Sequence, residues 1–190
     1  ARAAGPQAKV LVDTGHHYQA QNIEQIVAWL LSEKILGGFH FNDRRYADDD
    51  LTIGSIDPYQ IFRIFHEIAF FEWETRERVE IAYMIDQSHS LKNKIEEMIQ
   101  TVGTAQDLYA KAALVEHATL SRHQDSCSLI DAEECLKSAY QTDVRPYLRE
   151  WRKARGLAED PLQAFRQSGY LERITKERSE RNQSAGGSYA

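Results

Sequence analysis

The stretch that decides the fold spans residues 10–40 and reads VLVDTGHHYQAQNIEQIVAWLLSEKILGGFH. Residues 9–13 form a short apolar run, rich in β-branched side chains, that ends at a Thr-Gly pair and is typical of a buried strand. Apolar residues then recur at helical spacing over residues 22–34, with Asn22 as the expected N-cap. Because a second strand is expected at residues 38–42, the stretch predicts a strand–helix–strand unit.

The alternation of strands and helices continues beyond this unit. A polar, acidic loop covers residues 43–55, a mostly apolar helix opens at the Asp57-Pro58 pair, and a third strand is expected at residues 80–86. Continuous apolar strands separated by helices predict an α/β fold with a parallel sheet covered by helices. A polar, poorly ordered tail is expected at residues 177–190. Between the third strand and this tail, helices are expected over residues 91–102, 105–120, 131–154 and 161–178.

The composition of the 190-residue chain excludes several classes of protein. Hydrophobic residues make up 42% of the chain, charged residues 27%, and the net charge is −6. We therefore expect no general binding of nucleic acid or of an anionic membrane. No apolar run approaches the ~18 residues of a membrane span, and Cys127 and Cys135 are too few for a disulfide framework or a zinc site. These features predict a cytoplasmic protein.

Each expected strand ends in a residue of a type that binds metals, namely Asp13, His40 and Asp86. Because the carboxyl ends of parallel strands share one edge of the sheet, these side chains are expected to converge. The loop after the first strand adds His16, and the loop after the second adds Asp48 and Asp50. The spacing of two lets both aspartates point to one side if the segment is extended.

These six residues make up four carboxylates and two imidazoles without a nearby thiolate, which suits Mn²⁺, Mg²⁺, Co²⁺ or Zn²⁺. Six ligands divide into two sites, and so much negative charge in one cleft would be costly without cations. Each residue also has an ordinary alternative, as a turn or helix cap, a structural histidine or part of a solvated loop. The coincidence at all three strand ends favours the metal site, with His89 as a further residue that would orient a ligand.

Four segments carry a resemblance to a known family. They read VLVDTGHHYQAQNIEQIVAWLL (10–31), GGFHFNDRRYADDDLTIGSIDPYQIF (37–62), AYMIDQSHSLKNKIEEMIQT (82–101) and DPLQAFRQSGYLERITKER (160–178). Together they resemble the L-rhamnose isomerase family, of the shorter bacterial type, which belongs to the xylose-isomerase-like, metal-dependent sugar isomerases. The resemblance covers nearly the whole chain.

This resemblance implies a TIM (β/α)₈ barrel followed by a helical extension. The three expected strands would be the sixth, seventh and eighth of the barrel, so its last three βα units are expected at residues 1–123. The helical extension and a flexible tail are expected at residues 124–190. The family's fifth strand supplies a Glu that bridges the metals and a nearby Lys, neither of which has a counterpart here. We therefore expect this chain to be the C-terminal portion of the enzyme.

The resemblance also implies an activity and roles for the candidate residues. The expected reaction is aldose–ketose isomerisation, an intramolecular oxidoreduction that converts L-rhamnose to L-rhamnulose, and related members accept D-allose and D-psicose. Mn²⁺ is the usual metal, with two ions per complete active site, and homotetramers are usual. The ligands of the structural metal would be Asp13, His40 and Asp86. The ligands of the second, catalytic metal would be His16, Asp48 and Asp50.

Two alternatives stay open at the level of sequence. One is another metal-dependent enzyme on the same barrel, such as a sugar epimerase or an endonuclease-like hydrolase, although the acidic net charge argues against a DNA substrate. The other is an inactive piece or a binding module, because three parallel strands cannot close a barrel that needs eight.

Overall fold

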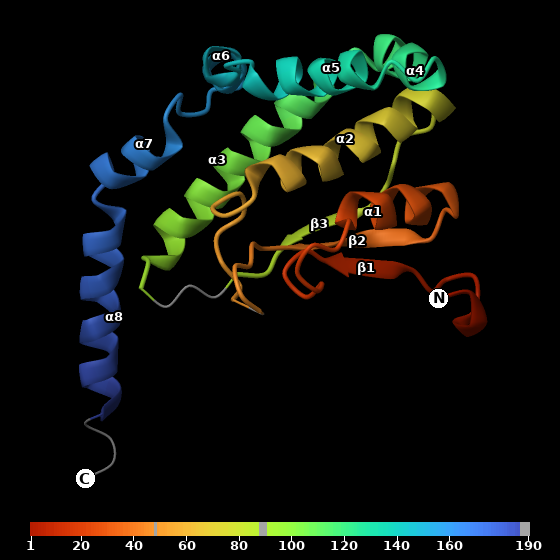
Figure 1. The fold of residues 1–190 in the computed structure, drawn as a ribbon. Helices are drawn as coiled ribbons and strands as arrows, with labels where there is room; N and C mark the ends of the chain where they lie inside the picture. Colours follow the sequence, from red (N-terminus) through yellow and green to blue (C-terminus); the bar gives the residue numbers. More distant parts are fainter. Residues whose placement is uncertain (48, 88–90, 187–190) are drawn as a thin grey trace. The chain divides into compact units, whose positions relative to one another are not determined.

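The computed structural model describes residues 1–47, 49–87 and 91–186 (Figure 1). Contacts between residues divide the chain into two compact units, Ala1–Arg145 and Pro146–Ala190. From the family resemblance, the barrel is expected to end after residue 123. The division into these two units does not test that expectation.

A three-stranded sheet lies in the first unit. Its strands are β1 (Val10–Asp13), β2 (Leu36–Phe41) and β3 (Ala82–Ile85). They are all parallel, with β2 between the other two, which confirms the parallel sheet expected from the sequence. β2 begins two residues earlier than expected, because Leu36 is buried and pairs with Val10 of β1.

The helices of the first unit follow the strands in the expected alternation. A short 3₁₀ helix, η1 (Arg2–Ala4), comes first, and the α-helices that the structure describes are α1 (Ile23–Ser32), α2 (Pro58–Thr75), α3 (Lys94–Ala113), α4 (His117–Asp125) and α5 (Leu129–Gln141). The N-caps that the sequence predicts are formed, since Asn22 accepts a hydrogen bond from the backbone of Gln25 and Asp57 accepts one from Gln60. Each such cap stabilises its helix by about 1 kcal/mol.

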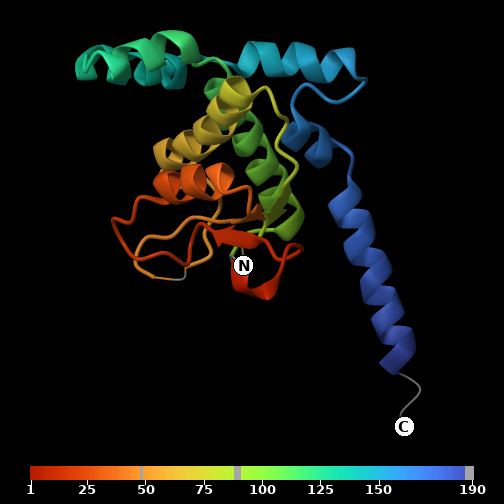
Figure 2. The same cartoon turned by 90° about the vertical axis from the view of Figure 1, so that its right-hand side faces the viewer.

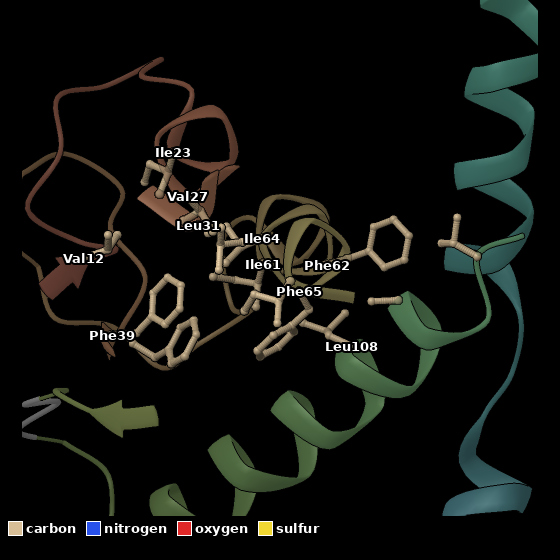
Figure 3. Close-up of a cluster of buried hydrophobic side chains, with 14 of the residues drawn as sticks. Val12, Ile23, Val27, Leu31, Phe39, Ile61, Phe62, Ile64, Phe65 and Leu108 are labelled. Carbon is tan, nitrogen blue, oxygen red and sulfur yellow. The ribbon is translucent and has the colours of Figure 1, made fainter. Parts of the chain in front are cut away.

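The hydrophobic core lies between the sheet and helices α1, α2 and α3 (Figure 3). Helix α2 is apolar on most of its surface because α1 and α3 both pack against it and the sheet contacts it as well, with the rings of Phe41 and Phe65 5.4 Å apart. Residues that contribute almost completely buried side chains to this core are Val12, Phe39, Ile23, Val27, Ile61, Phe62, Ile64 and Phe65.

Among the described residues of this unit, no helix covers the opposite face of the sheet (Figures 1 and 2). Side chains alternate between the two faces of a strand, so Leu11 lies on the side away from the buried Val12. Leu11 and Met84 are 44% and 37% exposed, although both are apolar. Asp13 and His40 share this face with them, and their side chains are 14% and 34% exposed.

Several of the expected helix boundaries are wrong, including those of the helix expected over residues 105–120, which is divided between α3 and α4. A break was expected near Gly103, but α3 runs through it, because a single glycine in a helix costs only about 1 kcal/mol. A single helix was expected over residues 131–154, but α5 ends at Gln141 and α6 (Arg145–Ala154) follows. Pro146 explains this break, because a continued helix would need its missing N–H to bond the carbonyl of Thr142.

The second unit is helical in the part that the structure describes. Helix α6 begins at the division between the units, and α7 (Pro161–Gln167) and α8 (Tyr170–Gly186) follow. The single helix expected over residues 161–178 is wrong, because Gly169 adopts a left-handed backbone with φ +62° between α7 and α8.

The expected poorly ordered tail is helical as far as Gly186. Its Glu, Arg and Gln residues are good helix formers, which accounts for the continuation of α8. Residues 187–190 of the expected tail lie outside the described residues. No helix in the described part of the chain is both long and apolar enough to cross a bilayer.

Candidate metal centre

Three of the predicted ligands meet at the carboxyl edge of the sheet. Asp13 is the last residue of β1 and pairs in register with His40 of β2, and Asp86 directly follows β3. His40 Nδ1 lies 3.0 Å from Oδ2 of Asp86 and 3.5 Å from Oδ2 of Asp13. One ligand atom from each of the three lies within 4.8 Å of the others. Parallel strands in this register therefore bring residues far apart in sequence to one point.

The spacing of these atoms fits a divalent cation. An octahedral cation with ligands at about 2.1 Å places neighbouring ligand atoms about 3 Å apart and opposite ones about 4 Å apart. Two carboxylates and an imidazole suit Mn²⁺, Mg²⁺, Co²⁺ or Zn²⁺. The side chains of His40 and Asp86 are 34% and 54% exposed, so an ion can reach them from the uncovered face. Metal binding by this group stays a prediction.

The carboxylate of Asp13 is held in a defined orientation. Its Oδ1 accepts hydrogen bonds from the backbone N–H of Gly15, at 3.1 Å, and from Nδ2 of Asn42, at 2.9 Å. Its Oδ2 instead faces two imidazoles, with His40 Nδ1 at 3.5 Å and His16 Nε2 at 3.8 Å. One oxygen of Asp13 is thus anchored to the protein, and the other is directed towards the candidate metal ligands.

The three residues expected at the second metal are placed less completely. His16 lies in the loop between β1 and α1, beside Asp13, with a side chain that is 53% exposed. Asp50 lies in the loop between β2 and α2, with a backbone φ of +46°. Neither belongs to the three-residue group that the described part of the chain forms. Asp48 lies outside the described residues, so the second site stays a prediction.

Asn42 is a residue of the site that the sequence interpretation missed. It is completely buried, and its backbone N–H donates to Oγ1 of Thr14 at 3.0 Å while its side chain donates to Asp13. The sequence contained a signal for this residue, because Asn42 lies two residues after His40 and the alternation of side chains along a strand puts both on one face. Its contact with the loop after β1 could not be inferred from a single strand.

Two carboxylates of the acidic loop have structural roles. Asp43 is 5% exposed and accepts a hydrogen bond from the backbone of Ile56 at 2.7 Å, and burial raises its pKa. Asp49 accepts hydrogen bonds from the backbone N–H groups of Tyr46, at 2.7 Å, and Arg45, at 2.6 Å, and these bonds lower its pKa. Asp49 therefore organises the loop as an ionised cap. Residues 45–47 of the same segment are exposed, so the ordinary alternative of a solvated loop stays open.

The other histidines that the structure describes do not belong to the three-residue group. His66 of α2 and His117 of α4 stack with their ring centroids 5.4 Å apart, and burial lowers the pKa of His66 to about 4. Burial also lowers the pKa of His17, which follows His16 in the loop after β1. His89 was expected to orient a ligand and lies outside the described residues.

Comparison with known proteins points to sugar isomerases. No protein-family model matches the chain. The chain is 43% identical over 178 residues to a probable sugar isomerase of Mesorhizobium japonicum, and equally similar to one of Rhizobium meliloti. Each alignment covers 94% of this chain and 41% of the relative. The chain therefore spans less than half the length of these relatives, whose names specify neither a sugar nor a metal.

Proposed function

We propose that this chain forms the metal-binding portion of an aldose–ketose isomerase that converts L-rhamnose to L-rhamnulose. The observation that carries the proposal is the meeting of Asp13, His40 and Asp86 at the carboxyl edge of a parallel sheet. The similarity to two probable sugar isomerases supports the class of reaction, and the resemblance of the four sequence segments supports the sugar. The same resemblance extends the proposal to a homotetramer.

In this proposal the ligands divide between two Mn²⁺ ions. The first ion is held by Asp13, His40 and Asp86, and His16 and Asp50 contribute to the second together with Asp48. A bound divalent cation supplies Lewis acidity to the two adjacent oxygens of an open-chain sugar. His16 is a neutral ligand when it binds a metal, so its share in the second site leaves the net positive charge of the ion higher than an all-carboxylate site would.

We propose further that the sheet is part of a (β/α)₈ barrel whose interior is the uncovered face. The exposed Leu11 and Met84 support this, because apolar side chains on such a face are buried once a barrel closes. Strand β3 is an edge of the sheet, and a cavity of about 720 Å³ adjoins it on the helical side, lined partly by Tyr83, Ile85 and Tyr109. A neighbouring βα unit would fill this space and pair with β3.

The activity is tested in a protein that contains this chain and has the length of its relatives, here called the full-length protein. After metal is removed with EDTA, the protein should convert L-rhamnose to a ketose only when Mn²⁺ is restored. Asp86→Asn should abolish conversion with the fold intact by circular dichroism, and Asp143→Asn, an exposed aspartate paired with Arg145, should leave it unchanged.

Two results would contradict the proposal. One is a well-folded full-length protein that converts no aldose in the presence of Mn²⁺. The other is cleavage of DNA with an abasic site, or epimerisation of a sugar without any ketose, which would move the same metal centre to a different class of enzyme.

A further inference from the structure

Arg44 joins the two loops that carry the second set of candidate ligands. It lies at the start of the loop between β2 and α2, just after Asp43. Its Nη1 donates a hydrogen bond to the carbonyl of Thr14, and its Nη2 donates one to the carbonyl of Tyr18 at 2.8 Å. Both carbonyls belong to the loop between β1 and α1. The guanidinium of Arg44 therefore brackets the segment that contains His16.

Hydrogen bonds hold the start of the loop that carries Arg44. The backbone of Asp43 forms a two-way bridge with Leu51, with N–O distances of 2.8 and 2.7 Å, which closes the intervening loop. The buried carboxylate of Asp43 also accepts the backbone N–H of Ile56. A second bond between the loops runs alongside, since Nε2 of Gln19 donates to the carbonyl of Arg45 at 2.8 Å.

We propose that Arg44 is a positioning residue that sets the place of His16 relative to the loop of Asp50, and so determines the affinity of the second metal site. This inference rests on the proposed function. A positioning role fits because Arg44 bonds the backbone on both sides of His16. Groups that orient metal ligands in this indirect way commonly change metal affinity by roughly 10- to 100-fold.

The role requires an arginine. The planar guanidinium presents several N–H donors in a fixed fork, so it can reach two carbonyls that are separated along a loop. The ammonium of a lysine is a single point of charge on a flexible stem and cannot hold both carbonyls in this geometry. Arg44→Lys therefore keeps the positive charge but loses the pair of hydrogen bonds to the two carbonyls. Arg44→Ala loses the charge and the hydrogen bonds together.

The test is a calorimetric titration of the metal-free, full-length protein with Mn²⁺. Wild type should bind two ions, and both Arg44→Lys and Arg44→Ala should weaken the second by at least tenfold while leaving the first unchanged. Guanidinium ion at millimolar concentration should restore part of the second affinity in Arg44→Ala. The matched control is Arg45→Ala, which removes a neighbouring positive charge from an exposed side chain that stacks on Tyr46.

A second readout needs no metal. Amide hydrogen exchange of residues 14–21 should be faster in Arg44→Ala than in wild type or Arg45→Ala, because the loop has lost both hydrogen bonds from the guanidinium. The inference is overturned if wild type binds two ions and Arg44→Ala binds both as tightly as wild type, or weakens both equally. If wild type binds fewer than two ions, the proposed function fails and the inference fails with it.

Discussion

Gly15 and Asn42 form a close contact at the end of β1 that orients a candidate metal ligand. A Cβ atom on Gly15 would collide with the side-chain oxygen and carbon of Asn42. Asn42 is completely buried there, and its Nδ2 holds Oδ1 of Asp13. The glycine therefore leaves the space in which the amide of Asn42 can reach the carboxylate.

Gly15→Ala should displace Asn42 and release Asp13. We expect the affinity for the first Mn²⁺ to fall by roughly 10- to 100-fold and the free energy of unfolding to fall by about 1–3 kcal/mol. Calorimetric titration and urea unfolding of the full-length protein measure these two quantities.

Gly103→Ala is the matched control for this prediction. Gly103 lies inside α3, and a Cβ there would meet no heavy atom within 4 Å. The substitution should leave metal affinity unchanged and raise stability by about 0.5–1 kcal/mol. Unchanged Mn²⁺ affinity in Gly15→Ala would show that the Asn42 contact does not orient Asp13.

At the scale of single residues, the sequence predicts which candidate ligands meet better than it predicts the residues that hold them in place. Asp13, His40 and Asp86 could be found because each marks a strand end, and parallel strand ends meet by rule. Arg44 and Gly15 gave no comparable signal, because each acts through a contact between two loops whose separation in space depends on the whole sheet.

At the scale of elements, helix α2 carries two adjacent residues whose pKa values are shifted in opposite senses. Burial, with help from His117 and Arg63, lowers the pKa of His66 from 6.5 to about 4. Burial raises the pKa of its neighbour Glu67 from 4.5 to about 7, and Arg63 opposes this shift. Both residues are therefore most stable in the fold when they are neutral.

The two shifts have opposite effects on stability as pH changes. Between pH 4 and 6.5 the unfolded chain binds a proton on His66 that the folded chain does not, so this residue makes stability rise with pH. Between pH 4.5 and 7 the folded chain keeps a proton on Glu67 that the unfolded chain releases, so this residue makes stability fall with pH. Over the shared window each effect amounts to about 2 kcal/mol.

Single substitutions should separate these opposing effects. Relative to wild type, His66→Gln should lose about 2 kcal/mol of stability, and Glu67→Gln should gain about 2 kcal/mol, as the pH rises from 4.5 to 6.5. Urea unfolding at the two pH values measures each change. Parallel pH profiles in wild type and both variants would contradict the assigned shifts.

Helix boundaries show why some element-scale predictions fail. Gly103 and Gly169 look alike in sequence, yet the first lies inside α3 and the second separates α7 from α8 with φ +62°. A glycine in the sequence indicates only that a left-handed backbone conformation costs little free energy at that position. Neighbouring packing decides whether it is used, and Leu108, which anchors α3 in the core beyond Gly103, favours a continuous helix there.

At the scale of the whole molecule, the exposed apolar face of the sheet bears on the proposed barrel. Leu11→Asn replaces a side chain that is 44% exposed in this structure, and such surface changes normally alter stability by less than about 0.5 kcal/mol. If the barrel closes over this face, the same change in the full-length protein should cost about 2–4 kcal/mol.

Leu129→Asn is the control for this prediction, because Leu129 of α5 is 71% exposed and lies away from the sheet. Urea unfolding of both full-length variants gives the comparison. A loss of stability in Leu11→Asn no larger than that in Leu129→Asn would show that the face stays open to solvent.

The parallel sheet could be predicted from the alternation of strands and helices. Whether a further segment covers the second face of the sheet could not be predicted from this alternation, because it depends on residues outside the pattern.

We propose that Asp13, His40 and Asp86 hold a divalent cation. The most direct measurement is an equilibrium titration of the metal-free, full-length protein with Mn²⁺, followed by electron paramagnetic resonance of the free ion. Wild type and Asp143→Asn should bind two ions, and His40→Phe should lose one while the protein remains folded. Equal binding of Mn²⁺ by wild type and His40→Phe would contradict the claim.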